Sequence, residues 1–256
     1  MKYFIRTSAL LILFAFAACD RGGREDALSD GDADRSLLVF SKTDGFRHGS
    51  IEAGQDALQK LGIENNVTVY VTEDASEFTE EFLSGMDAVV FLNTTQTLFN
   101  DEQRTAFKGY IQNGGGFAGV HSAADTEYDW PWYNGLVGAW FNNHPPGTPK
   151  ALLNVVDPNH PSTEGLPQIW EKVDEWYNFR DISENINVLI TLDTDSYEGS
   201  DHPGNHPVAW FHEYDGGRAF YTALGHTSES YTEDLFLDHL WNGIGYAMGI
   251  HGGRHE

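Results

Sequence analysis

Residues 101–125, DEQRTAFKGYIQNGGGFAGVHSAAD, place a helix, a strand and a tight turn in one run. Asn100 precedes the run as an N-cap, and Gln103 completes a capping box with it. Gly114 stands where a helix of this length would end, as glycine commonly does at a C-terminal cap. The apolar segment GFAGVHS (116–122) then predicts a strand.

The turn after this strand holds a histidine at the position where some α/β enzymes hold a nucleophile. In a nucleophile elbow a Ser or Cys occupies a sharp turn among small residues, whereas here the position belongs to His121, with Ser122 as a second candidate. The glycines of GGGFAG (114–119) do not indicate a phosphate-binding loop, because the strand follows them and no GxGxxG or P-loop lysine is present. His121 is therefore expected to be an acid/base group or a ligand.

The residues before this run repeat the alternation of strand and helix. Strands are predicted at 36–43, 67–74 and 86–95, with helices at 51–62 and 77–85. Short links between alternating strands and helices predict an α/β fold with a parallel sheet covered on both faces. The loops that follow the strands, TDGFRHG, NTTQTLFN and HSAADTEYDW, should therefore meet at one edge of the sheet.

The second half of the chain is less regular. Strands are predicted at 149–158 and 186–194, and DEWYNF (174–179) predicts a short strand or turn. A hairpin through YDGG is predicted within 206–226, and a last helix within 231–249.

The N-terminal residues predict export and a lipid anchor. Residues 1–18 have a basic start and a short apolar core, as in a signal peptide, and small residues precede Cys19 as in a bacterial lipobox. An ordinary signal peptide with an accidental cysteine is the alternative. Residues 19–35 are charged and predict a flexible tether before one domain at 36–250. The expected product is a membrane-anchored lipoprotein of the periplasm or cell surface.

The charge of the chain restricts its partners. The formal net charge is −24, and loss of Lys2 and Arg6 with the signal peptide makes it −26. Such a surface repels nucleic acid and anionic polysaccharide, so neither is expected as a partner. The charge does not exclude neutral sugars as ligands. The seven Trp and eleven Tyr could stack on sugar rings, although aromatic residues also form protein cores.

Several titratable residues fall in loops or at strand ends. His226 follows the predicted hairpin, and Glu229 lies three residues later, as a carboxylate that could orient it. In an extended DEWYNF segment, Glu175 and Tyr177 would face one side and Trp176 the other. Glu175 and Tyr177 could bind sugar hydroxyls or abstract a proton, or the segment could be a capped turn around a core Trp.

These motifs together resemble the trehalose-utilisation (ThuA-like) family. The resemblance rests on VFSKTDGFRHGSIEAG, on the run from NTTQTLFN to HSAADT, on DEWYNF and on HPVAWFHEYDGGRAFYTALGHT, and covers about 37–249. It implies a fold similar to class I glutamine amidotransferases, a flavodoxin-like three-layer sandwich with a mainly parallel central sheet. The amidotransferase set is Cys, His and Glu, and His121 takes the place of the Cys, so thioester chemistry is not expected.

The resemblance implies sugar metabolism in which a companion dehydrogenase oxidises a disaccharide to a 3-keto-glycoside. The ketone acidifies the C2 proton, so acid/base chemistry can eliminate or hydrolyse the glycosidic bond, or isomerise the sugar. The expected catalytic residues are His121, His226 and Glu175. The expected substrate-binding residues are Arg47 and His48, which could hold an enolate, and Asp125, Trp130, His144, Tyr177 and His206.

Two other interpretations stay open. No cofactor is evident, and no HExxH or similar spacing is present, yet a divalent metal could use His121, His144 and His226 as ligands and polarise the ketone. The chain could instead be a sugar-binding lipoprotein without catalysis. Convergence of His121 and His226 in one site favours an enzyme, whereas scattered histidines favour the binding protein.

Overall fold

The computed structural model describes residues 35–250. The predicted signal peptide, Cys19 and the tether before Arg35 lie outside these residues. Within the described part, no helix is both long and apolar enough to cross a membrane.

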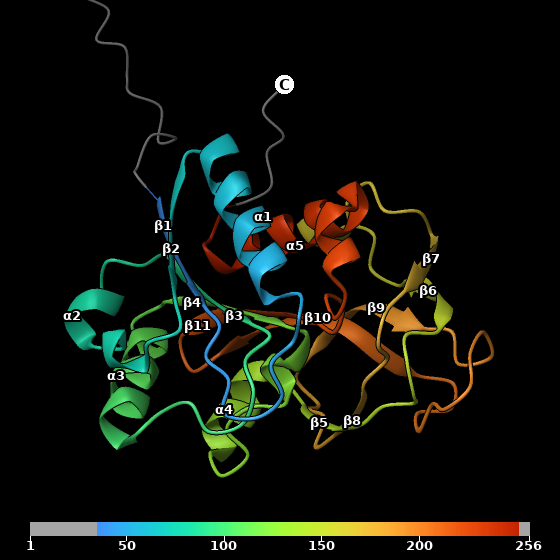
Figure 1. Cartoon of the computed structure of the whole chain (residues 1–256), viewed down its shortest axis with the longest axis horizontal. Helices are drawn as coiled ribbons and strands as arrows, with labels where there is room; N and C mark the ends of the chain where they lie inside the picture. The colour runs from blue at the N-terminus through green and yellow to red at the C-terminus, as the bar shows by residue number, and fades with distance from the viewer. Residues whose placement is uncertain (1–34, 251–256) are drawn as a thin grey trace, which may run out of the picture. The chain divides into compact units, whose positions relative to one another are not determined.

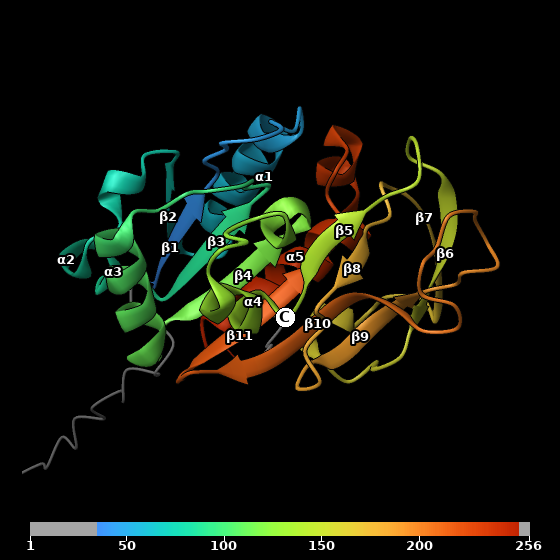
Figure 2. The same cartoon turned by 90° about the horizontal axis from the view of Figure 1, so that it is seen from below.

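The central sheet has nine strands within residues 35–250, in the order β2-β1-β3-β4-β11-β10-β9-β6-β7. One half is parallel and consists of β1 (Arg35–Phe40), β2 (Val67–Thr72), β3 (Ala88–Leu92), β4 (Gly116–Val120) and β11 (Gly217–Thr222). In this half β1 pairs with β2 and β3, and β4 pairs with β3 and β11. The strands β3 and β4, which are parallel and fully buried, confirm the predicted α/β class. Figure 2 shows them side by side in the sheet.

The other half of the sheet is antiparallel. It consists of β10 (His206–Tyr214), β9 (Asn187–Leu192), β6 (Lys150–Val155) and β7 (Ile169–Val173). The predicted hairpin is confirmed: β10 and β11 are joined by Asp215 and Gly216, whose φ angles of 48° and 104° suit a type I′ turn. The flavodoxin-like fold class holds, and the sheet is mixed because β10, β9, β6 and β7 add antiparallel pairings beyond β11.

Helices cover both faces of the sheet (Figure 1). On one face lie α1 (Ile51–Glu64) and α5 (Asp234–Ala247), and on the other α2 (Glu80–Leu83), α3 (Asp101–Gln112) and α4 (Pro131–Val137). The Asn100–Gln103 capping box at the start of α3 is present as predicted. A separate two-stranded sheet pairs β5 (Trp140–Asn143) with β8 (Asn178–Arg180). Single 3₁₀ turns occupy Ala75–Glu77, His121–Ala124, Pro161–Thr163 and Ser228–Thr232.

Aromatic side chains fill the core beneath the parallel half. Phe91 on β3 packs on Phe107 of α3 and on Phe117 of β4, with ring centroids 5.2 and 5.3 Å apart. All three side chains are fully buried, which stabilises the fold by about 2 kcal/mol each. This packing holds β3 and β4 rigidly, and with them the turns at their carboxyl ends.

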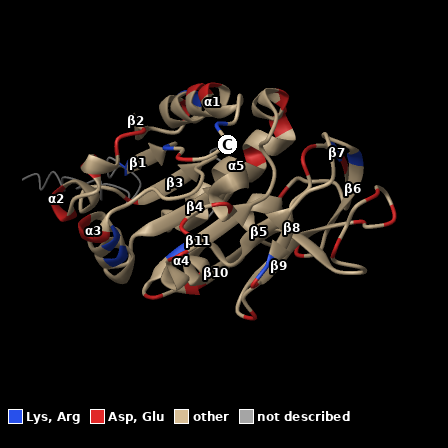
Figure 3. Cartoon of the chain, turned by 60° about the horizontal axis from the view of Figure 1, so that its bottom comes forward, with Lys and Arg blue, Asp and Glu red and all other residues tan. Residues whose placement is uncertain are grey.

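Charged residues lie on the outer helices and loops. Figure 3 shows acidic segments spread over these elements and few basic ones among them. The distribution agrees with the excess of 39 Asp and Glu over 15 Lys and Arg.

Candidate functional site

Three histidines and a glutamate meet at the carboxyl edge of the parallel strands. His48 comes from the loop between β1 and α1, His121 from the end of β4, and His226 from the residues after β11. Glu175 comes from the segment between β7 and β8. One ligand atom from each of the four lies within 4.8 Å of the others. Parallel strands end at the same edge of a sheet, which is why segments far apart in the chain converge here.

The backbone at His121 is bent into the left-handed region. Its φ is 49°, an uncommon value for a residue with a side chain, and the Tyr221 hydroxyl donates to its carbonyl at 2.7 Å. Gly119 makes room for the turn, since a Cβ there would lie 2.9 Å from the Tyr221 ring. The sharp turn aims the imidazole over the end of the sheet, as an elbow aims a nucleophile.

The hydrogen bonds of His121 decide where its proton lies. Nδ1 is 2.8 Å from the carbonyl oxygen of Ala223, which can only accept, so Nδ1 carries the hydrogen. In the neutral ring Nε2 is then an acceptor. It lies at hydrogen-bond distance, 3.1 Å, from Nδ1 of His226 and 3.5 Å from Oε2 of Glu175. This nitrogen can accept a proton or bind a metal.

Glu175 and His226 form an ion pair. Oε2 of Glu175 is 3.1 Å from Nδ1 of His226. Burial opposes both charges, but hydrogen bonds and mutual attraction outweigh it: the pKa of Glu175, which also faces His121, lies well below its usual range, and the pKa of His226 is raised. Within residues 35–250 nothing hydrogen-bonds to Nε2 of His226, so this end of the ring is available to a ligand.

His48 closes the cluster as a neutral ring. Burial lowers its pKa to about 2, and the neighbouring imidazoles of His121 and His226 add to the shift. Its ring stands edge-on to theirs, with centroids 4.8 and 5.1 Å away. Nδ1 is 3.3 Å from the hydroxyl of Ser122, a long contact that fixes the ring only weakly.

Asp174 positions the two members of the ion pair and was not among the expected site residues. One of its oxygens accepts from the backbone N–H groups of Glu175 and His226 at 2.9 and 3.0 Å, and the other accepts from Gly225 at 2.9 Å. The side chain is fully buried. In the sequence the only signal was its place in DEWYNF, because two of its three backbone donors come from a distant segment.

Alternation in DEWYNF places Glu175 and Tyr177 on the side of the cluster. The Tyr177 ring lies 4.1 Å from that of His121, whereas Trp176 donates from its indole to the Pro149 carbonyl at 2.7 Å. His144, after β5, reaches the other oxygen of Glu175 at 3.2 Å. Tyr177 and His144 therefore flank the cluster.

Asp125 lies in the turn that His121 begins. Its carboxylate accepts from Tyr128 at 2.5 Å and from Gln96 at 3.0 Å. Burial raises its pKa, although these two hydrogen bonds oppose the shift. Gln96 has a φ of 60°, so the strand ends at β3 and β4 both contain left-handed residues.

Access to the cluster is narrow. His121 is fully buried, while 10% of the Glu175 side chain and 24% of the His226 side chain are exposed. The His144 side chain is 36% exposed. Two surface hollows of about 450 and 330 Å³ are lined by other residues. A ligand would therefore reach His226 and His144 first.

Arg47 and Trp130 point away from this cluster. Arg47 forms a two-pronged ion pair with Glu73 at 2.8 and 2.9 Å and contacts Glu52 at 2.8 Å, so its charge is already paired at the surface. Trp130 packs against Trp132, with ring centroids 4.8 Å apart, and under the guanidinium of Arg104. Local spacing predicted both residues for this edge, but it could not give the direction of either side chain.

His206 and Glu229 also differ from expectation. Nε2 of His206 lies 2.7 Å from the Tyr177 carbonyl, and Nδ1 is occupied by Tyr197 and Ser200. The ring thus supports the Glu175–Tyr177 segment from behind. Glu229 is exposed in a 3₁₀ turn, and the carboxylate that faces His226 is Glu175.

Fold and site define an α/β protein of amidotransferase-like architecture in which histidines and a glutamate meet at the carboxyl edge of the parallel strands. The chain belongs to the ThuA family, described as trehalose utilisation, whose model matches residues 36–247. This membership supports a role in sugar utilisation.

Solved structures agree with this fold. A ThuA-like protein from Bacteroides uniformis is 21% identical, with a TM-score of 0.72 over 84% of this chain and 92% of its own. A second one, from Parabacteroides merdae, is 21% identical, with a TM-score of 0.71 over 87% and 93%. A protein described as a GMP synthase subunit, from Thermoplasma acidophilum, is 16% identical, with a TM-score of 0.51 over 85% and 96%. A search among curated proteins gave no match.

Proposed function

We propose that this protein is a carbohydrate-active enzyme that acts on 3-keto-glycosides, such as a derivative of trehalose, by acid/base chemistry. The observation that carries the proposal is the pair of imidazoles at one point: Nε2 of His121, the acceptor nitrogen when that ring is neutral, lies 3.1 Å from Nδ1 of His226, which Glu175 holds. A site that combines a base with an acid is suited to moving a proton between two atoms of one substrate.

The proposed step begins at the proton on C2, which the C3 ketone makes acidic. His121 takes this proton, and the C–H electron pair forms an enolate. The enolate then reforms the ketone while a C1–C2 double bond forms and the C1–oxygen bond breaks. The departing oxygen takes a proton from His226, whose raised pKa favours its charged form. Addition of water across the new double bond completes a net hydrolysis.

The remaining residues of the edge would bind the sugar. The neutral ring of His48 could donate a hydrogen bond to the enolate oxygen without carrying a charge. Asp125, His144 and Tyr177 surround the cluster with groups that bind hydroxyls.

The test compares two glutamates in the full-length protein. Glu175→Gln removes the charge that holds His226 and should lower turnover of 3-keto-trehalose by about 100-fold or more. Glu229→Gln, the matched control, removes an exposed charge and should leave turnover unchanged. Release of glucose and exchange of the C2 proton for deuterium, followed by NMR, measure the reaction. Equal rates in both variants would contradict the proposal, and binding of sugar without turnover by the unaltered protein would favour the non-catalytic binding protein.

A bound divalent metal is a second way in which the same site could act. It is favoured by the four ligand atoms within 4.8 Å and by the His121 Nδ1–Ala223 contact, since metal-binding histidines commonly donate their other N–H to a carbonyl. The ion would polarise the ketone. Loss of turnover on treatment with a chelator, restored by zinc or manganese, would support this form; full turnover in the chelator would exclude it.

We also propose that the reaction takes place at a membrane surface, through a lipid on Cys19. In cells, Cys19→Ser should move the protein from the membrane fraction to the soluble fraction, and an unchanged distribution would contradict the anchor.

A further inference from the structure

We propose that Phe46 is the platform on which the apolar face of a sugar ring stacks at this site. The inference rests on the proposed function, because it assigns a sugar to the cluster of His48, His121, Glu175 and His226. Phe46 itself belongs to none of the hydrogen bonds that hold this cluster, so its part would be in binding and specificity.

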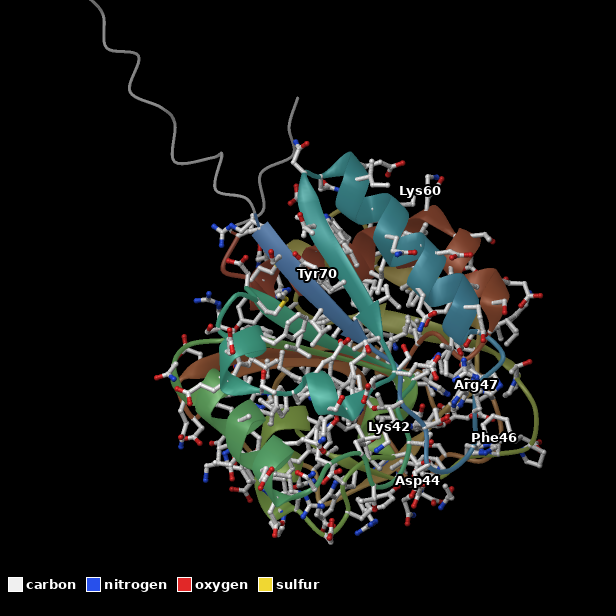
Figure 4. All side chains as sticks on the ribbon, turned by 60° about the vertical axis from the view of Figure 1, so that its left-hand side comes forward. Lys42, Asp44, Phe46, Arg47, Lys60 and Tyr70 are labelled. Atoms are coloured by element: carbon white, nitrogen blue, oxygen red, sulfur yellow. The ribbon has the colours of Figure 1, made fainter. Side chains whose placement is uncertain are left out.

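Phe46 is exposed and its aromatic neighbour is a residue of the site. Its exposed fraction is 66%, and its ring stands edge-on to His48 at a centroid distance of 4.9 Å. The other exposed aromatic residue within 35–250 is Tyr70, which is 44% exposed and packs against Phe82 at 6.0 Å. Figure 4 labels both, with Phe46 beside Arg47 on the loop after β1 and Tyr70 on β2.

The backbone on either side of Phe46 is fixed by Thr95. The N–H of Asp44 donates to the Thr95 carbonyl at 3.1 Å, and the N–H of Gly45 to the Thr95 hydroxyl at 3.2 Å. That hydroxyl in turn donates to the Phe46 carbonyl at 3.1 Å. Single exposed apolar residues are common on proteins, but this one is presented by a loop tied to the strand-end turn after β3.

The two neighbours of Phe46 in the chain are held as well. Gly45 lies against Gln96, where a Cβ would come within 2.5 Å of the Gln96 side chain. Arg47 is anchored by its two-pronged pair with Glu73. The loop therefore cannot fold Phe46 inward easily, and the ring stays in water in the absence of a ligand.

The surroundings of Phe46 match the two kinds of surface that a pyranose presents. The axial C–H groups of the ring form an apolar face that an aromatic ring can cover, and the hydroxyls at its rim need polar partners. Gln96, which touches Gly45, also donates to Asp125, so hydroxyl-binding groups lie next to the platform. An exposed apolar ring beside His48, with polar groups next to it, fits a neutral sugar better than an anion, given the acidic surface.

The experiment uses the full-length protein with two measurements: binding of trehalose by calorimetry, and KM and kcat for 3-keto-trehalose. Phe46→Ala should weaken binding and raise KM by about tenfold while kcat changes less than threefold. Phe46→Trp, which restores a flat aromatic surface, should recover most of the affinity. Tyr70→Ala, which removes the other exposed aromatic ring, should change neither quantity.

The outcomes separate this inference from the proposed function. If trehalose binding depended on Phe46 but the keto sugar was not turned over, the proposed stacking on Phe46 would be supported and the proposed enzymatic function would be wrong. Turnover with the same KM in Phe46→Ala as in the unaltered protein would overturn the platform and leave the enzyme. Absence of measurable binding and turnover in the unaltered protein would overturn both.

Discussion

Two histidines near the carboxyl end of β11, His239 and His226, differ in what surrounds each ring. His239 on α5 bonds to the Ser162 carbonyl at 2.8 Å and to the Thr222 hydroxyl at 3.1 Å, and burial lowers its pKa to about 4. His226, a few residues beyond the same strand, faces Glu175 and His121, and its pKa is raised. Burial alone therefore does not make a histidine a candidate functional residue. Titratable partners do, because they stabilise the charged imidazole and allow it to give up or take a proton.

The largest effect on turnover is expected when His226 is replaced, and a much smaller one when His239 is replaced. His226→Gln keeps a polar side chain but removes the proton that Glu175 holds in place, so turnover of 3-keto-trehalose should fall by about 100-fold to 10,000-fold. His239→Gln, the matched control, alters a ring that touches no member of the cluster and should retain turnover at a temperature where the variant is folded. Steady-state rates on both proteins measure the difference. If His226→Gln and His239→Gln lost turnover to a similar degree, the difference between the two histidines would concern folding and not activity.

The second prediction concerns acid stability. The pKa of His239 is about 4 in the folded protein, while an unfolded imidazole titrates near 6.5. Between these values the unfolded chain binds more protons, so stability is complete above pH 6.5 and falls as the pH drops to 4, by about 3 kcal/mol from this residue. Urea unfolding at several pH values measures the slope. His239→Gln should make the slope shallower, and an unaltered slope in that variant would reject the assignment.

Replacement of Asp174 should have a smaller effect, on both the free energy of unfolding and kcat. Asp174→Asn replaces one acceptor oxygen by a donor that would face a backbone N–H, and should lower the free energy of unfolding by about 2 kcal/mol. Because the same carboxylate positions Glu175 and His226, kcat should fall in the folded variant while KM changes little. Asp201→Asn, at an exposed surface position, serves as the control. If both variants kept the kcat of the unaltered protein, Asp174 would be a purely structural residue.

The smallest effect is expected at Ser122, the other candidate nucleophile of the turn. Its hydroxyl is fully buried and 3.3 Å from His48, a long contact. Ser122→Ala should therefore lower turnover less than tenfold, and a serine-directed fluorophosphonate should not inactivate the protein. A loss as large as that of His226→Gln would instead make Ser122 the reacting group.

Interactions between near neighbours in the chain were predictable. The capping box of Asn100 and Gln103 depends on a separation of three residues, and the tight turn of the β10–β11 hairpin on the YDGG sequence. The common side of Glu175 and Tyr177 follows from alternation along an extended chain. Each of these features depends on backbone geometry within a few residues, so it can be predicted from the local sequence.

The identity of contacts between distant segments was not predictable in the same way. Glu229 is near His226 in the chain, yet the carboxylate beside His226 is Glu175, brought there through the backbone bonds of Asp174. His206 stood at a strand end like the others, but β10 directs it beneath Tyr177. Spacing can place a residue at an edge, while the direction of its side chain depends on the strands next to it.

The sequence by itself determined the elements and the edge at which they end, because periodicity, capping and turn residues act over one or two turns of chain. It also determined that His121 stands where an elbow presents its reactive group. The tertiary structure alone decided which groups face that histidine. Those contacts join residues as far as 105 positions apart, and they exist only because the order of strands in the sheet sets β4 beside β11.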